Sequence, residues 1–368
     1  MKTRGSTLLG GTTLLGGTIA VIACLSLVLI PDGASGDDWP QWRGPKRDGV
    51  WRESGIVEKL PAKLRIKWRR EIGAGYAGPA VAGGRVYLAD RVLDRDERNP
   101  RNQFSRSAVR GKERVLCLDA ESGEVVWEHA YPCRYEVMYP SGPRATPTAA
   151  GGKVYAVGAM GNLFCLDAAK GSVIWSKNYV DDYGTEINGW GMSSAPLVDG
   201  QKVIVLVGGT ENRLVMALDK DSGKEIWRSL ALDDPGYAAP VIFEAGGARQ
   251  LIVWTPRHVN SLDPATGAVH WQQPFKVNSS LSIPTPIYDP KRQLLLVTSF
   301  YNGSLMLKLE KERPAAELLW KGKSSSETKT DGLHAIMCTP FLDDGHIYGV
   351  CSYGQLRCLE ADTGKRVW

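Results

Sequence analysis

The chain has 368 residues, 23% of them charged, and a formal net charge of +5. This mild excess comes without any nucleic-acid-binding motif, so the composition predicts no nucleic-acid partner. The seven cysteines form no Cys-x-x-Cys pair, and the five histidines show no close ligand spacing. These absences exclude the common zinc, redox and metalloprotease signatures, and no metal site is predicted.

The first 36 residues have the pattern of an export segment. Lys2 and Arg4 precede an uncharged stretch over residues 5–31, and small residues follow at 34–36. This order favours a signal peptide that is cleaved after export. The alternatives are an uncleaved membrane anchor over the same stretch and a lipoprotein attached at Cys24. All three predict that residues 37–368 are exported to the periplasm or the cell envelope.

Basic side chains gather in residues 91–114, among acidic ones. The stretch falls between the second and third predicted strands of the first complete repeat. We interpret it as a long, solvated surface insertion. Binding of an acidic partner or an anionic membrane surface is the alternative.

From residue 68 onward, a tryptophan ends the same short phrase about every fifty residues. In the regular copies Gly follows Asp by four positions, and Trp follows Gly by four. The residues of this repeat are Asp119, Gly123 and Trp127; Asp167, Gly171 and Trp175; Asp219, Gly223 and Trp227; Asp263, Gly267 and Trp271; and, in the last copy, Gly364 and Trp368. An apolar run, a turn closed by Gly and a run ending in Trp predict strand, turn and strand. One copy departs, because Glu310 is followed by Pro314 and a longer turn before Trp320.

A second pattern precedes each phrase: a Pro, a short strand, a Gly- or Asp-containing turn and a β-branched run. Each repeat therefore holds four short strands, which predicts an all-β protein built as a β-propeller of four-stranded antiparallel blades. The seven tryptophans are predicted to pack between sheets. The complete units are 79–127, 147–175, 196–227, 240–271, 286–320 and 340–368.

Trp68 ends an orphan strand that precedes these six units. Such a strand usually completes a blade whose other strands come from the far end of the chain, because closure removes exposed sheet edges. We therefore expect seven or eight blades in the full ring, and a closing segment that lies beyond residue 368.

The phrase Asp-x-x-[Ser/Thr]-Gly-x-x-x-Trp resembles the repeat of PQQ-type quinoprotein propellers. This repeat is shared by quinone-dependent alcohol dehydrogenases and by BamB-like propellers of outer-membrane assembly. The resemblance covers residues 39–368, and the opening Trp39-Pro-Gln-Trp42-Arg43-Gly44-Pro45 is similar to that of exported PQQ-binding-like repeat proteins. It implies an eight-bladed scaffold.

The resemblance extends to the scaffold but not to catalytic residues. Family enzymes stack a planar quinone in the central funnel beside Ca²⁺, use an Asp base and commonly carry two adjacent cysteines. No two cysteines are adjacent here, and no Cys-x-x-Cys-His haem motif is present. We therefore predict no catalytic residue and no PQQ or other cofactor. The predicted function is a binding or scaffold module; the alternatives are a PQQ-dependent oxidoreductase-like protein and a propeller that binds a small ligand or carbohydrate.

The loops that precede the strand-opening prolines supply the candidate ligand residues. In a propeller these loops cross one face, and we expect a cation, two aromatic rings, a carboxylate and an imidazole to converge there. The five residues are Arg144, Trp190, Tyr237, Asp331 and His334. The structural alternative is that Arg144 pairs with Asp331 while the two aromatic rings pack. The predicted partner is a protein or cell-envelope component bound through this face.

Overall fold

The computed structural model describes residues 36–55 and 58–368, in a compact unit that ends at Asp37 and a second unit over residues 38–368. The export segment predicted over residues 1–36 lies outside the described residues, except for its last residue. In the described part of the chain the helices are α1 (Tyr179–Tyr183) and the 3-10 turn η1 (Asn278–Ser280). No helix there is long and apolar enough to cross a membrane.

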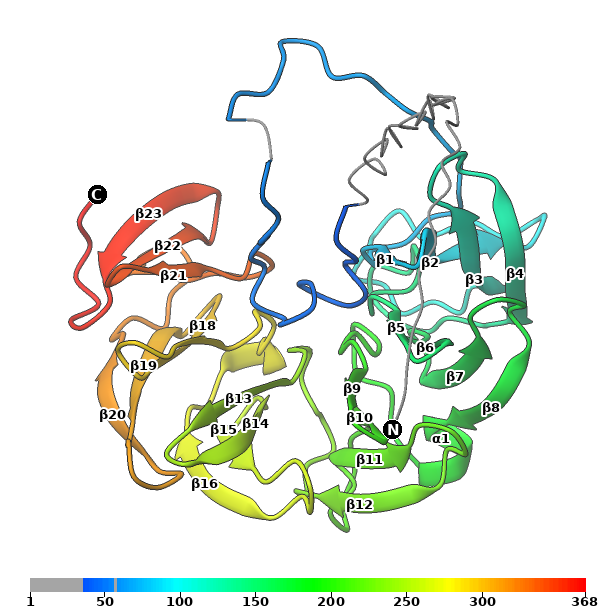
Figure 1. Ribbon diagram of the computed structural model, residues 1–368. Coiled ribbons are helices and arrows are strands. Elements are labelled where there is room, and N and C mark those ends of the chain that lie inside the picture. The colour runs from blue at the N-terminus through cyan, green and yellow to red at the C-terminus, as the bar shows by residue number, and fades with distance from the viewer. Residues whose placement is uncertain (1–35, 56–57) are drawn as a thin grey trace, which may run out of the picture. The chain divides into compact units, whose positions relative to one another are not determined.

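The second unit consists of consecutive antiparallel sheets, each made from one stretch of chain (Figure 1). Within the described residues five sheets are four-stranded, and the last has three strands. The strands are β1 (Ala80–Ala82), β2 (Arg85–Leu93), β3 (Gly111–Asp119), β4 (Val125–Pro132); β5 (Thr148–Ala150), β6 (Lys153–Val157), β7 (Asn162–Asp167), β8 (Val173–Asn178); β9 (Leu197–Asp199), β10 (Lys202–Leu206), β11 (Val215–Asp219), β12 (Glu225–Ser229); β13 (Val241–Ala245), β14 (Ala248–Trp254), β15 (His258–Leu262), β16 (Val269–Pro274); β17 (Ile287–Asp289), β18 (Leu294–Ser299), β19 (Gly303–Leu309), β20 (Ala316–Lys321); β21 (Phe341–Asp343), β22 (His346–Cys351) and β23 (Gln355–Glu360). The prediction of an all-β propeller with four-stranded antiparallel blades is confirmed.

The two ends of the sheets differ. One end, the loop face, carries the turns between second and third strands and the linkers from one sheet to the next. The opposite end, the turn face, carries the Asp-x-x-x-Gly turns and the short turns between first and second strands. The insertion at residues 94–110 therefore belongs to the loop face, as a long connection between β2 and β3.

The Asp-x-x-x-Gly phrase forms a tight turn for local reasons. Asp119 Oδ1 accepts hydrogen bonds from the N–H groups of Glu121 and Ser122, both at 3.0 Å. Gly123 then takes a φ of +73°, which side chains other than glycine's rarely adopt. A register shift at Cys117/Leu118 brings the fourth strand back against the third, and the next four blades repeat it.

Five of the repeat tryptophans contact the turn of the following repeat. Trp127 Nε1 donates to the carbonyl of Ala168 at 2.9 Å. Its ring covers Gly171, where a Cβ atom would lie 2.5 Å from the ring. Trp68, Trp175, Trp227 and Trp320 make the same pair of contacts with the following turns. Glycine is therefore required for two reasons: the backbone has a positive φ, and a Cβ atom would clash with the tryptophan ring.

The core lies between neighbouring sheets. A row that runs across the first blade, Ala80, Tyr87, Cys117 and Trp127, is buried against the second blade. Burial of one such aromatic ring removes on the order of 150–250 Å² from water. Similar apolar clusters lie between the later blades.

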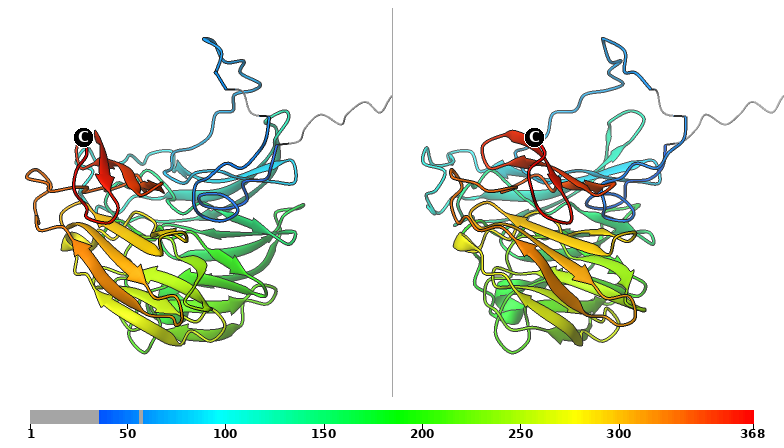
Figure 2. Two further views of the ribbon diagram at one scale, coloured as in Figure 1. Left: turned by 60° about the vertical axis from the view of Figure 1, so that its left-hand side comes forward. Right: turned by 90° about the vertical axis from the view of Figure 1, so that its left-hand side faces the viewer.

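The sixth sheet and the segment around Trp68 differ from the expectation of six complete blades and an orphan strand. The row that is buried elsewhere is open in the sixth sheet, where Phe341, Tyr348 and Trp368 are 43%, 38% and 52% exposed. In the place of a fourth strand, Arg366 forms an isolated bridge to Leu359. Residues 58–72 form no strand, because no third strand lies beside them in the described structure. Figure 2 shows residues 58–68 (blue) extending beyond the sheets.

Candidate functional site

Three of the five predicted ligand residues lie in one region of the loop face. Arg144, on the linker from β4 to β5, donates through Nη2 to the carbonyls of Met138 and Tyr139 at 2.9 and 2.6 Å. Burial lowers the pKa of Arg144, and the nearby hydroxyl of Tyr135 is the largest influence that opposes this effect. Met138, whose carbonyl Arg144 binds, donates through its N–H to the carbonyl of Gly189, next to Trp190, at 2.8 Å. The ring of Tyr237 meets that of Trp190 edge to face, with centroids 6.0 Å apart. The structure thus brings a cation and two aromatic rings together.

Arg144 lies above a buried polar network. Its guanidinium carbon is 5.9 Å from the centre of the Tyr135 ring, which also contacts Arg91 at 3.8 Å. The hydroxyls of Tyr131 and Tyr135 both donate to Glu113, which is 1% exposed. Burial is the main cause that raises the pKa of Tyr135. These contacts fix Arg144 on a rigid base and do not resemble a reactive site.

Asp331 and His334 form a separate pair on the linker from β20 to β21. His334 is fully buried; its Nε2 lies 3.1 Å from Asp331 Oδ1 and its Nδ1 lies 3.1 Å from the Phe300 carbonyl. Both ring nitrogens therefore lie within hydrogen-bonding distance of an oxygen. Burial opposes ionisation of Asp331, but hydrogen bonds from the Lys323 N–H and from His334 bring its pKa below the usual value. The pair holds the linker against the turn between β18 and β19, and its contacts do not overlap with those of Arg144.

Residues 38–49, the axial segment, run along the inner strands of five blades (Figure 1, dark blue). Trp39 pairs with Val81 of β1, and Pro40 accepts from the N–H of Ala149 in β5. Further along, Trp42 Nε1 donates to Thr285 Oγ1 at 2.7 Å, just before β17. No site role was predicted for residues 38–49, whose signal in the sequence is two tryptophans among Gly and Pro.

Arg47 is the charged centre of the axial segment. It is 3% exposed and donates to the carbonyls of Ala195, Pro196 and Pro240, at the starts of the third and fourth blades. Its Nε donates to Gln41 Oε1 at 2.9 Å. Burial lowers the pKa of Arg47 to about 9. All of these acceptors are neutral oxygens. Because the carbonyls belong to different blades, Arg47 links parts of the chain that are distant in sequence.

The inner residues do not fit the Ca²⁺ ion that the quinoprotein resemblance implies beside the quinone. A Ca²⁺ ion needs carboxylate and amide oxygens around it. Here the buried cation of Arg47 lies at the starts of the third and fourth blades, and its charge would repel such an ion. In the described part of the chain no three His, Cys, Asp or Glu side chains are grouped as a metal site requires.

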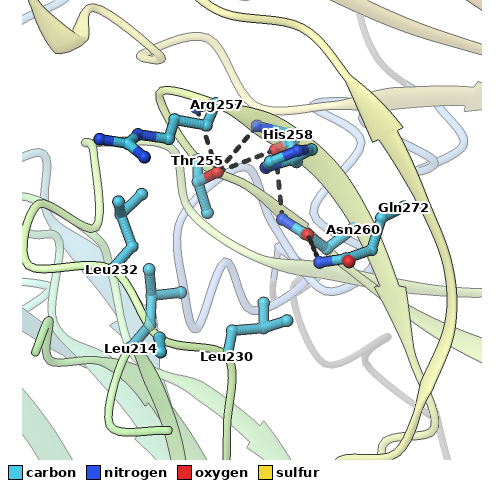
Figure 3. Close-up of a pocket in the computed structure, with 9 residues that line it drawn as sticks. Leu214, Leu230, Leu232, Thr255, Arg257, His258, Asn260 and Gln272 are labelled. Atoms are coloured by element: carbon cyan, nitrogen blue, oxygen red, sulfur yellow. Dashed lines mark hydrogen bonds between the residues drawn. The ribbon is translucent and has the colours of Figure 1, made fainter. Parts of the chain in front are cut away.

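Two adjoining cavities that share Arg257 lie on the loop face, and we name them together the blade 3–4 cleft. The smaller one, of about 160 Å³, lies between the third and fourth blades; the larger one, of about 430 Å³, lies between the β14–β15 turn and the linker that follows β16. Figure 3 shows aliphatic side chains on one side of the smaller cavity and polar ones on the other. The aliphatic residues are Leu214, Leu230 and Leu232; the polar ones are Thr255, His258, Asn260 and Gln272.

A family model and a solved structure agree with this fold. A family model described as "Outer membrane protein assembly factor BamB" matches residues 111–368. The structure of BamB from Moraxella catarrhalis aligns with a TM-score of 0.50 at 19% identity, covering 72% of each chain. A europium-containing methanol dehydrogenase aligns with a TM-score of 0.47 at 14% identity, over 90% of this chain and 84% of that one. No curated protein matches the sequence.

Proposed function

The chain belongs to the family of the outer membrane protein assembly factor BamB, and from this premise we propose that residues 37–368 form a non-enzymatic propeller domain of the cell envelope. In this proposal the domain binds a protein partner through its loop face. Residues 1–36 direct its export, and they either leave as a signal peptide or remain as a membrane anchor.

The observation that carries the proposal is the exposure of three large apolar side chains on loops of this face. Tyr353, Met337 and Phe104 are 70%, 67% and 60% exposed. Tyr353 also extends an aromatic cluster, because its ring centre lies 5.8 Å from that of Phe300. Aromatic and methionine side chains are enriched in the cores of protein interfaces, since they bury large areas with few rotatable bonds or adapt to many shapes.

The axial segment argues against the oxidoreductase alternative. It fills the inner edges of five blades and places the buried Arg47 among them. We expect PQQ with Ca²⁺, titrated into the purified protein, to change neither its absorbance nor its melting temperature. A saturable shift in either would restore the alternative.

Site-specific crosslinking tests the binding face. We place a photoreactive phenylalanine analogue at Phe104 or Tyr353 on the loop face, and at Lys170 on the turn face as the matched exposed control. Irradiation of cells should give defined crosslinked proteins from the two loop-face sites and none from Lys170. Equal products from both faces, or none from the loop face, would contradict the proposal.

Export is tested separately by cell fractionation. A full-length protein should be found with the envelope, and a variant that lacks residues 1–36 should stay in the cytoplasm. The size of the exported protein distinguishes a cleaved signal from a retained anchor. A full-length protein found in the cytoplasm would contradict this part of the proposal.

A further inference from the structure

The larger cavity of the blade 3–4 cleft is lined by two cations. Arg257 and Lys276 belong to adjacent stretches, which are tied by the N–H of Phe275 to the carbonyl of Arg257 at 2.8 Å and by that of Val277 to the carbonyl of Pro256 at 2.9 Å. Both side chains are exposed, and in the described part of the chain neither has an ion pair or a side-chain hydrogen bond. None of the residues that line either cavity is acidic. The fold thus holds two like charges near one another without a counter-ion.

Such an arrangement favours an anion from outside. Two cations that share a cavity repel each other, and an anion bound between them adds an attraction to each. A guanidinium matches a carboxylate through two parallel N–H···O bonds, while an ammonium adds a compact point charge. Ser279 and Ser280 line the same cavity with φ of +54° and +58°. Backbone strain of this kind concentrates at ligand-binding segments.

The smaller cavity adds an apolar neighbour to this anion site. Leu214 is fully buried, and Leu230 and Leu232 are partly buried beside it. The opposite wall is fixed by its own bonds, such as Gln272 Nε2 to Asn260 Oδ1 at 2.8 Å (Figure 3). A volume of about 160 Å³ equals roughly five waters of bulk liquid, which is enough for one apolar side chain.

We propose that the blade 3–4 cleft binds a polypeptide segment in which a carboxylate stands next to an apolar side chain. The carboxylate lies between Arg257 and Lys276, and the apolar side chain enters the smaller cavity against Leu232. This site rests on the proposed function, because it gives the loop face a defined contact with its protein partner. The carboxylate comes from a chain terminus or from an Asp or Glu side chain, and the probes below distinguish the two.

Fluorescence anisotropy with short labelled peptides tests the cleft directly. One peptide, Gly-Ser-Gly-Gly-Phe, has a free C-terminal carboxylate; a second is its C-terminal amide; a third is capped at both ends and carries Asp-Phe internally. Wild-type protein should bind the first or the third at least about tenfold more tightly than the amide. Whichever of the two binds identifies the source of the carboxylate. Affinity should fall between about 50 and about 500 mM salt, because charge pairs at an exposed site are screened.

Matched variants assign the binding to the cleft. The double variant Arg257→Gln/Lys276→Gln should lower affinity at least about tenfold. Lys170→Gln/Lys224→Gln, which removes two exposed charges from the turn face, should leave affinity unchanged. Leu232→Ser should weaken the Phe peptides while it leaves a Gly-terminated peptide unaffected. Equal melting temperatures of all variants exclude unfolding as the cause.

Two results would overturn the site. One is wild-type affinity in the Arg257→Gln/Lys276→Gln variant; the other is no saturable binding of either carboxylate peptide up to about 1 mM at low salt. Failure of the cleft is distinguishable from failure of the proposed function. If crosslinks from Phe104 and Tyr353 persist while no peptide binds, the loop face has a partner but the cleft does not supply this contact.

Discussion

The junction between the first and second blades and the junction between the fourth and fifth use the same fourth-strand tryptophan in different ways. Trp127 reaches the next blade, where it donates to the Ala168 carbonyl and covers Gly171. Trp271 instead donates to Gln250 Oε1 of its own blade at 2.8 Å. The fifth blade has the irregular turn from Glu310 to Pro314 in the place of the glycine turn. Because the fifth blade lacks the glycine turn, the Trp271 N–H bonds the side-chain oxygen of Gln250, where Trp127 bonds a main-chain carbonyl.

The irregular junction is held by other contacts. Gln250 is fully buried, accepts from Ser261 Oγ at 2.7 Å and donates to the Ala245 carbonyl at 2.8 Å. Across the junction the rings of Phe243 and Tyr288 stack at 4.2 Å. The comparison shows that a repeat protein keeps the geometry of its blades while it exchanges the chemistry that joins them. Energies should therefore differ between the two junctions even where the residue is the same.

The largest expected effect separates the two tryptophans. Trp127→Ala should destabilise the domain by about 3–5 kcal/mol, because a large ring leaves a cavity between two blades. Trp271→Ala should have a smaller effect, since this ring is more exposed and its hydrogen bond stays within one blade. Denaturant unfolding followed by tryptophan fluorescence and by circular dichroism measures both. Equal losses would show that the two junctions do not differ energetically.

The second prediction separates backbone conformation from crowding. Gly171→Ala should destabilise by about 2–3 kcal/mol, because the new Cβ adds a clash with the Trp127 ring to an unfavourable positive φ. Gly247→Ala is the matched control in the fourth blade: its φ is +66°, but the nearest atom lies 4.0 Å from the new Cβ. The control should lose only about 1 kcal/mol. The junction model fails if both variants lose the same amount.

The third prediction concerns the buried glutamine. Gln250→Leu should cost about 1–3 kcal/mol, because the Trp271 Nε1–H loses its acceptor and remains in a half-buried position. In a double-mutant cycle with Trp271→Phe, the two changes should lose less together than the sum of their separate losses. Strict additivity would show that the Gln250–Trp271 bond contributes nothing.

The sequence predicts the blades well because their signals are local. Asp119 and Gly123 are four residues apart, so the geometry of their turn depends on neighbours along the chain. The axial segment could not be foreseen, because Arg47 meets carbonyls 148 and 193 residues away. For the same reason Arg144 and Asp331, expected around one opening, have separate sets of contacts in the structure. The proximity of Arg257 and Lys276 could have been predicted from the sequence. They flank the open end of the β15–β16 hairpin, where His258 pairs with Pro274, so the hairpin brings them side by side.

The smallest expected effect is the acid sensitivity of the turns at Asp119 and Asp219. The irregular turn has Glu310 and Pro314 in place of this Asp and its Gly. Hydrogen bonds from Ser122 to Asp119, and from Ser222 to Asp219, lower the pKa of both carboxyls below the ordinary value of 3.8. A lowered pKa in the folded state contributes stability that is present above the ordinary value and is lost as pH falls through the folded one. The variant Asp119→Asn/Asp219→Asn keeps an acceptor oxygen but cannot be protonated in this range. Its melting temperature should therefore fall less than that of the wild type between about pH 5 and about pH 2. Parallel acid profiles for the two proteins would show that the turn carboxylates do not set this sensitivity.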